Sequence, residues 1–160
     1  MAYFAERDAR SDIRMSDIVQ FALLTARRQE EICRLRWVDV DPVRGIAWMD
    51  DVKHPRMKKG NRRCFRVLAD AAAIIGRQPS KGVSEYVFPF NSKSVSSVFT
   101  RTCKILGIAD LRFHDLRHEA ASRLFERGYA IQEVAQFTLH ESWATLKRYT
   151  HLKPENVPER

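Results

Sequence analysis

Three segments with apolar residues at helical spacing each stop at a glycine, and this pattern restricts the chain to a mostly helical fold. The segments cover residues 69–75, 94–106 and 115–127, and Gly76, Gly107 and Gly128 follow them. Apolar residues three and four positions apart share one face of a helix, and glycine often follows a helix end because it adopts left-handed backbone angles. We therefore expect several short helices packed around one core.

The N-terminal part of the chain predicts a helix, a break and a second helix. Ser16 is a candidate cap for the first helix, because apolar residues recur at helical spacing directly after it. A tight turn is expected near Thr25 and Ala26. Residues 31–36 then predict the next helical segment.

A β-hairpin interrupts the helical pattern in the middle of the chain. Residues 46–52 and 64–68 predict two strands, and the loop between them contains proline and glycine. Further short helices are expected over residues 131–137 and 144–149. The predicted fold class is mainly α with a small antiparallel β-hairpin or sheet.

The charge of the chain indicates a polyanionic partner. The 160 residues carry a net charge of +8 at neutral pH, although the hydrophobic content of 44% is ordinary for a globular domain. A basic domain of this size most often binds nucleic acid, and the alternative is that the charge serves solubility alone.

Cysteine usage and apolar runs argue against several classes of protein. The three cysteines are widely spaced and form no CxxC pair, so neither a zinc knuckle nor a disulfide framework is predicted, and a cytoplasmic location fits. His118 and Glu119 lack the second histidine of an HExxH metal site. The charged residues 1–14 are unlike a secretory signal, and we expect no contact with a membrane.

Five residues appear in an order that suits attack on a phosphodiester. They are Arg28, His114, Arg117, His140 and Tyr149. A tyrosine hydroxyl can serve as the nucleophile, and guanidinium groups hold phosphate oxygens through the transition state. Histidines can exchange protons or donate hydrogen bonds. With enough cations around the phosphate, such a site needs neither a metal nor a cofactor.

Two runs within this set resemble boxes of the tyrosine recombinases, also called phage-type integrases. Residues 112–122 (RFHDLRHEAAS) resemble the second box of that family, and residues 146–151 (LKRYTH) resemble its nucleophile box. The resemblance implies that Tyr149 forms a 3′-phosphotyrosyl link with double-stranded DNA. It also implies self-assembly into a tetramer on DNA.

The resemblance assigns further roles. Arg28, with Glu31 three residues on, and Arg117 are the two phosphate clamps, whereas Arg27 is expected to be a solvated surface arginine. His114 accepts a proton from the tyrosine or binds phosphate, and His140 donates a hydrogen bond to a phosphate oxygen. Alanine and leucine precede Arg27 and His140 where the family usually has glycine.

The predicted hairpin is strongly basic. Lys53 is the favoured general acid for the leaving 5′ oxygen, and Lys59 is the alternative because Gly60 and Asn61 follow it. Contacts with the DNA backbone are expected from Arg56, Lys58, Lys59, Arg62 and Arg63.

The resemblance covers about residues 17–152, and nothing in the sequence matches the N-terminal helical domain that family members usually carry. We expect one catalytic domain over residues 1–160, with an N-terminal segment (1–14) and a C-terminal tail (153–160). The predicted function is site-specific DNA recombination by a phage or mobile-element enzyme in the bacterial cytoplasm. Two alternatives stay open: a type IB topoisomerase, and a non-catalytic DNA-binding remnant.

Overall fold

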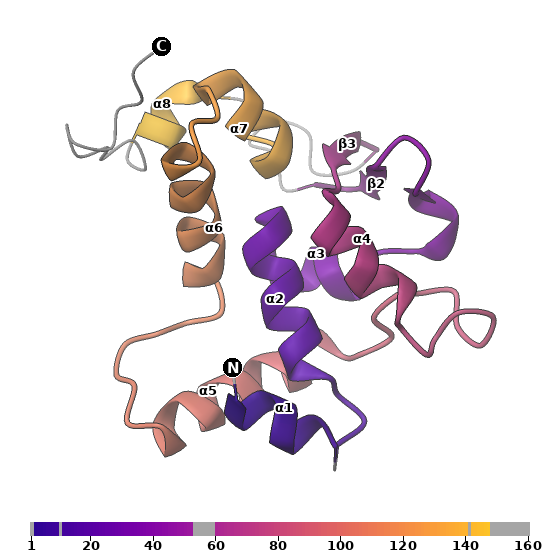
Figure 1. The fold of residues 1–160 in the computed structure, drawn as a ribbon, viewed down its shortest axis with the longest axis vertical. Coiled ribbons are helices and arrows are strands. Elements are labelled where there is room, and N and C mark those ends of the chain that lie inside the picture. Colours follow the sequence, from indigo (N-terminus) through magenta and orange to yellow (C-terminus); the bar gives the residue numbers. More distant parts are fainter. Residues whose placement is uncertain (1, 10, 53–59, 141, 148–160) are drawn as a thin grey trace.

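The computed structural model describes residues 2–9, 11–52, 60–140 and 142–147, and Figure 1 shows their arrangement. The helices are α1 (Ala2–Asp8), α2 (Met15–Thr25), α3 (Gln29–Cys33), the 3-10 turn η1 (Trp37–Asp39), α4 (Ala69–Gly76), α5 (Ser92–Ile105), α6 (Asp115–Glu126), α7 (Ile131–Thr138) and α8 (Trp143–Leu146). The strands are β1 (Val40–Asp41), β2 (Ile46–Asp50) and β3 (Arg62–Arg66). The predicted fold class, mainly α with a small antiparallel sheet, is confirmed.

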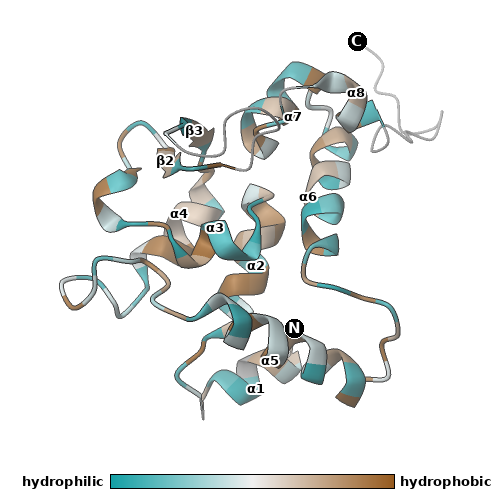
Figure 2. Cartoon of the chain, turned by 180° about the vertical axis from the view of Figure 1, so that it is seen from behind, coloured by the Kyte–Doolittle hydropathy of each residue, from teal (hydrophilic) through white to brown (hydrophobic). Residues whose placement is uncertain are grey.

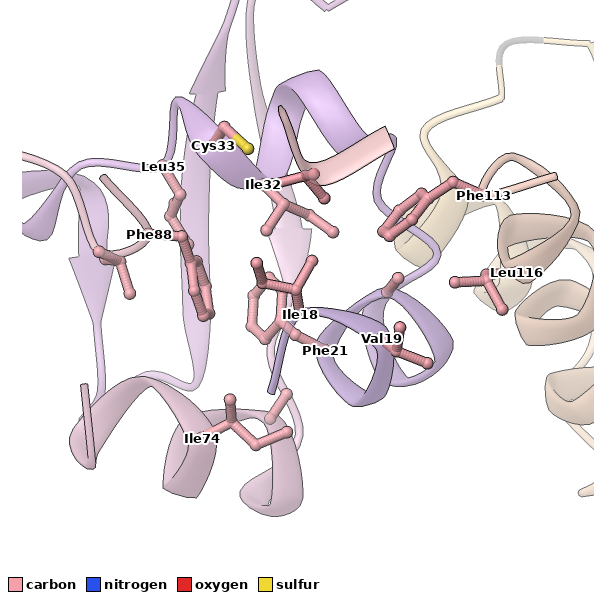
Figure 3. Packing of buried hydrophobic residues seen from close by; sticks show 14 of the residues in the cluster. Ile18, Val19, Phe21, Ile32, Cys33, Leu35, Ile74, Phe88, Phe113 and Leu116 are labelled. Atoms are coloured by element: carbon pink, nitrogen blue, oxygen red, sulfur yellow. The ribbon is translucent and has the colours of Figure 1, made fainter. Parts of the chain in front are cut away.

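Helix α2 forms the centre of the molecule. Its residues Ile18, Phe21 and Ala22 are fully buried, as expected for residues spaced three and four apart. Figure 3 shows this face against Phe88, and the Phe21 and Phe88 ring centroids lie 5.1 Å apart. Hydrophobic residues gather where α2 and α4 meet, whereas α5 and α6 carry many hydrophilic ones (Figure 2).

The sheet is antiparallel with the strand order β1-β2-β3. Ala47 and Met49 of β2 are buried and pair with Phe65 and Arg63 of β3. Side chains alternate along a strand, so one face of this sheet contributes to the core. The predicted first strand is two residues too long, because Asp51 adopts a left-handed φ of 50°.

Helices α6, α7 and α8 pack around a second group of buried side chains. Leu124 and Phe125 of α6 meet Val134 and Phe137 of α7 and Leu146 of α8. Leu116, at the start of α6, belongs instead to the core around α2 (Figure 3). Helix α6 therefore contributes side chains both to the core around α2 and to the group that it shares with α7 and α8.

The sequence did not predict α1, and the predicted cap of α2 is wrong. Ser16 lies inside the first turn of α2, and the carboxylate of Asp8 accepts hydrogen bonds from the N–H groups of Met15 at 2.8 Å and Ser16 at 2.9 Å. The ring of Phe4 also stacks on Phe99, with centroids 6.4 Å apart. The cap is thus provided by a neighbouring helix.

Helix ends follow the glycine pattern in two of three places. Gly107 and Gly128 have left-handed φ angles of 67° and 83°, as expected after α5 and α6. Gly76 is instead the last residue of α4, and Arg77 follows it as the cap. Within the described part of the chain, no helix combines the length and apolarity needed to cross a membrane.

Candidate active site

The turn between α2 and α3 directs two consecutive arginines to opposite sides of the backbone. Helix α2 ends at Thr25, and Ala26 has a left-handed φ of 54° and donates its N–H to the Ala22 carbonyl at 2.9 Å. A residue with a Cβ in this region costs about 1–2 kcal/mol, and the packing around the fully buried Ala26 offsets this. Alanine therefore makes the predicted break without glycine.

Arg28 caps α3 and is held by Glu31. The backbone N–H of Arg28 donates to Glu31 Oε2 at 3.0 Å, and Arg28 Nη1 donates to Glu31 Oε1 at 2.7 Å. The Arg28 side chain is 25% exposed, whereas that of Glu31 is 4% exposed. One carboxylate thus caps the helix and orients a guanidinium that still faces solvent.

Glu31 is a carboxylate surrounded by arginines. Burial alone raises the pKa of this carboxyl group, but the positive charges of Arg27, Arg28 and Arg117 outweigh burial and hold the pKa below its ordinary value. Three guanidinium groups therefore share a single negative charge. The cluster keeps a net positive charge that suits an anionic ligand.

Arg117 joins the ends of two helices beside this cluster. Its guanidinium is buried, and it donates to the Ala26 carbonyl and to the Thr138 carbonyl, each at 2.6 Å. Nη2 also lies 3.4 Å from His140 Nε2. Because arginine can only donate, this contact requires His140 to accept at Nε2 and carry its proton on Nδ1.

His140 follows a turn like that after α2. Leu139 caps α7 with a left-handed φ of 56° and donates its N–H to the Ala135 carbonyl at 2.8 Å. Leucine therefore makes the bend for which glycine was expected. His140 comes next, half-buried and beside Arg117.

His114 lies at the start of α6, one turn before Arg117. Its ring meets that of His118 edge to face, with centroids 4.9 Å apart. Loss of water on the covered side of the ring, followed by the positive fields of His118, Arg117 and Arg28, lowers the pKa of His114, and only Asp115 opposes them. The imidazole is therefore neutral at pH 7 and can accept a proton.

Arg27 does not lie on the surface, so that prediction is wrong. It is 1% exposed, and it donates to the Thr25 carbonyl from Nε at 3.3 Å and to the Phe137 carbonyl from Nη2. Nη1 lies 3.4 Å from Glu31 Oε2, and the guanidinium carbon is 4.7 Å from the Phe65 ring centre. These partners replace part of the water that a buried guanidinium loses, and Nη1 keeps only its ion pair with Glu31.

Part of the predicted site lies outside the described residues. This applies to Lys53, Arg56, Lys58, Lys59 and Tyr149, so their assignments stay predictions. The structure brings together Arg28, His114, Arg117 and His140, which come from three separate stretches of the chain. The inward direction of Arg27 was not predicted from the sequence, although its spacing of four residues from Glu31 is a signal for such an ion pair.

Arg62 and Arg63, the described arginines among the predicted DNA contacts, leave β3 in opposite directions. Arg62 Nη2 lies 2.5 Å from Asp39 and Nη1 lies 3.2 Å from Asp50, both carboxylate contacts. Arg63 alternates with Arg62 and lies on the face of the buried Phe65. Their DNA contacts stay predictions, and the carboxylates compete with phosphate for Arg62.

The described residues offer no group of three or more histidine, cysteine or acidic side chains that could hold a metal ion. Cys33 and Cys103 are buried, and burial, followed by the charge of Glu30, raises the pKa of Cys33 to about 11. This thiol is therefore protonated at neutral pH and is a poor nucleophile.

Known proteins resemble this chain over nearly all of its length. Residues 1–156 match the description "Phage integrase family". The shufflon-specific DNA recombinase of Escherichia coli is 36% identical over 152 residues, which is 94% of this chain and 37% of that protein. The integrase of Salmonella phage P22 is 30% identical over 162 residues, or 91% of this chain and 41% of that protein.

A solved structure shares the fold. The Tn1549 transposon integrase in complex with circular intermediate DNA superposes with a TM-score of 0.73 at 14% identity, covering 97% of this chain and 62% of that one. The chain spans about two-fifths of the length of the two sequence relatives named above.

Proposed function

The chain belongs to the phage integrase family, and on that premise we propose that it is the catalytic domain of a tyrosine recombinase, which cuts and rejoins DNA strands. The observation that carries the proposal is the convergence of Arg28, His114, Arg117 and His140. Arg117 touches both the turn before Arg28 and the ring of His140. The fold thus gathers the cations and imidazoles that phosphoryl transfer requires.

Arg28 and Arg117 have different tasks in this proposal. The Arg28 guanidinium is partly exposed and can approach a phosphate oxygen directly. Both Nη atoms of Arg117 are held by backbone carbonyls, so its position is fixed before any ligand arrives. A preorganised positive charge stabilises the transition state without reorganisation during the reaction.

The reaction we propose begins at Tyr149. Its Oη attacks phosphorus, the bond from phosphorus to the 5′ oxygen breaks, and a 3′-phosphotyrosyl link remains. The neutral His114 takes the tyrosine proton, in keeping with its lowered pKa. Lys53, or Lys59 in its place, gives a proton to the leaving oxygen. Attack by a 5′-hydroxyl of another strand reverses these steps, so no external energy source is needed.

Double-stranded DNA is the proposed partner. The net charge of +8 supports it, and the Tn1549 integrase to which the chain is similar was solved with DNA. We also propose that the chain assembles as a tetramer on DNA. The bacterial cytoplasm is the proposed place of action, because the two sequence relatives come from a bacterium and a bacteriophage.

The test is capture of a covalent complex on nicked DNA. A nick just beyond the cut site lets the released fragment diffuse away, so the adduct accumulates and shifts a 5′-labelled strand in a denaturing gel. Wild-type chain is first challenged with a randomised library of nicked duplexes to find a substrate. Tyr149→Phe removes the nucleophile and should give no shifted band while retaining most DNA affinity.

The other results decide between the alternatives. A wild-type chain that attaches to no duplex in the library would support the non-catalytic remnant. A chain that attaches, relaxes supercoiled plasmid and never joins two duplexes would support the topoisomerase. An unchanged band from Tyr149→Phe would show that another residue is the nucleophile.

A further inference from the structure

We propose that Arg27 is a positioning residue: its buried contacts fix the position of His140 relative to Arg28. The idea rests on the proposed function, because it concerns the same site. Arg27 contacts no substrate, since its side chain is fully buried. It would act through Glu31 and through the helix end that precedes His140.

The basis is a double connection between two helix ends. Arg27 donates to the carbonyls of Thr25 and Phe137. Arg117 donates to the carbonyls of the next residue in each segment, Ala26 and Thr138. The guanidinium groups of Arg27 and Arg117 thus bridge the same two segments, at consecutive carbonyls in each segment.

These carbonyls belong to helix ends that need donors. The last carbonyls of a helix have no partner within it, and they carry the negative end of the helix dipole. The carbonyls of α2 at Thr25 and of α7 at Phe137 both receive an N–H group from Arg27. One charged side chain therefore satisfies both ends and fixes their separation.

The positions of Arg28 and His140 follow from that separation. Arg28 lies two residues after the left-handed Ala26 that ends α2. His140 directly follows the left-handed Leu139 that ends α7. Both turns contain a residue with a Cβ at positive φ, so their backbones are strained. A strained turn keeps its shape only when neighbouring contacts hold it, and Arg27 supplies one contact to each.

Arg27 also changes the charge that Arg28 presents. If Glu31 paired with Arg28 alone, the carboxylate would neutralise the guanidinium. Arg27 lies 3.4 Å from Glu31 Oε2 and shares that carboxylate. With Arg117 nearby, the cluster has three positive groups and one negative group, so Arg28 retains attraction for an anion.

The test compares Arg27→Met with Arg77→Met in the full chain. Arg77 is a matched control because it also pairs with a buried carboxylate, that of Asp17, away from the site. Carbon–proton correlation NMR spectra give the chemical shifts of the His140 ring. The His140 peak is assigned as the one that disappears in His140→Gln. Arg27→Met should move the His140 peak, and Arg77→Met should leave it in place.

A second measurement uses the cleavage rate in a single turnover. Arg27→Met should slow covalent attachment about 10²-fold, because small displacements of positioned groups have effects of this size. The loss should shrink when His140 is already glutamine, since coupled residues are not additive. Equal losses in both backgrounds, or a wild-type His140 peak in Arg27→Met, would overturn the proposal.

A second variant, Arg27→Lys, keeps the test informative if Arg27→Met does not fold. Lysine keeps the charge, but its single ammonium group cannot bridge both carbonyls. A folded Arg27→Lys chain should still show a displaced His140 peak, and an unmoved peak would refute the positioning role. If the wild-type chain forms no covalent complex, the proposed activity fails, whereas the NMR comparison still decides what Arg27 does.

Discussion

Removing the charge of Glu31 should destabilise the fold far more than removing the charge of a surface glutamate. Glu31→Gln preserves the shape of the side chain but leaves Arg27 buried without a counter-ion. Breaking one side of a buried ion pair costs about 3–5 kcal/mol. The glutamine oxygen can still accept from the Arg28 N–H, so we expect the lower end, about 3 kcal/mol.

The control is Glu119→Gln. Glu119 pairs with Arg123 at 2.7 Å, but both side chains are 51% exposed. Exposed pairs contribute about 0.5 kcal/mol or less within a helix, because water and salt screen them. Urea unfolding followed by tryptophan fluorescence gives both free energies. Equal losses in the two variants would refute the view that Glu31 neutralises a buried cluster.

The pH dependence gives the same prediction a second test. The folded-state pKa of Glu31 lies below its ordinary value of 4.5, so the stabilisation is complete above that value. It is lost as the pH falls through the folded pKa, because the carboxylate becomes protonated. The difference between wild type and Glu31→Gln should therefore be constant at neutral pH and shrink below about pH 4.5.

Three further predictions concern the site. Arg28→Ala should slow covalent attachment about 10²-fold or more in single-turnover assays, with little change in melting temperature, because its side chain is partly exposed. Lys53→Ala should be slow on normal DNA and rescued by a 5′-phosphorothiolate, whose sulfur leaves without a proton, whereas Lys59→Ala should show no rescue. Rescue of Lys59→Ala instead would reassign the general acid. Ala26→Gly should change stability by no more than about 1 kcal/mol in urea titrations, because relief of the left-handed strain offsets the flexibility of glycine. A larger loss would mean that packing of the Ala26 Cβ contributes more than the left-handed strain costs.

Local patterns predicted the elements more reliably than their ends. The apolar spacing placed α2, α5 and α6 within a few residues, because one face of each helix must be buried. The start of α2 was misjudged because its cap is Asp8, which belongs to another helix. A carboxylate that folds back from α1 leaves no signature at the position it caps.

The sequence by itself determined the family and the residues that its motifs contain. The spacings between Arg28 and Glu31, and between His114 and Arg117, lie within single helical turns, so local geometry keeps them together. Those residues could be found without a structure. The chemistry proposed for them was inferred from the same sequence, because guanidinium groups bind phosphate oxygens and imidazoles exchange protons.

Only the tertiary structure decided which of two neighbouring arginines faces the solvent. Arg27 and Arg28 have the same side chain and nearly the same sequence environment. The left-handed turn at Ala26 separates their directions, and the inward one needs acceptors within the core. One of those acceptors is the Phe137 carbonyl, 110 residues away along the chain. A guanidinium can be buried only where such partners meet, and folding alone brings them together.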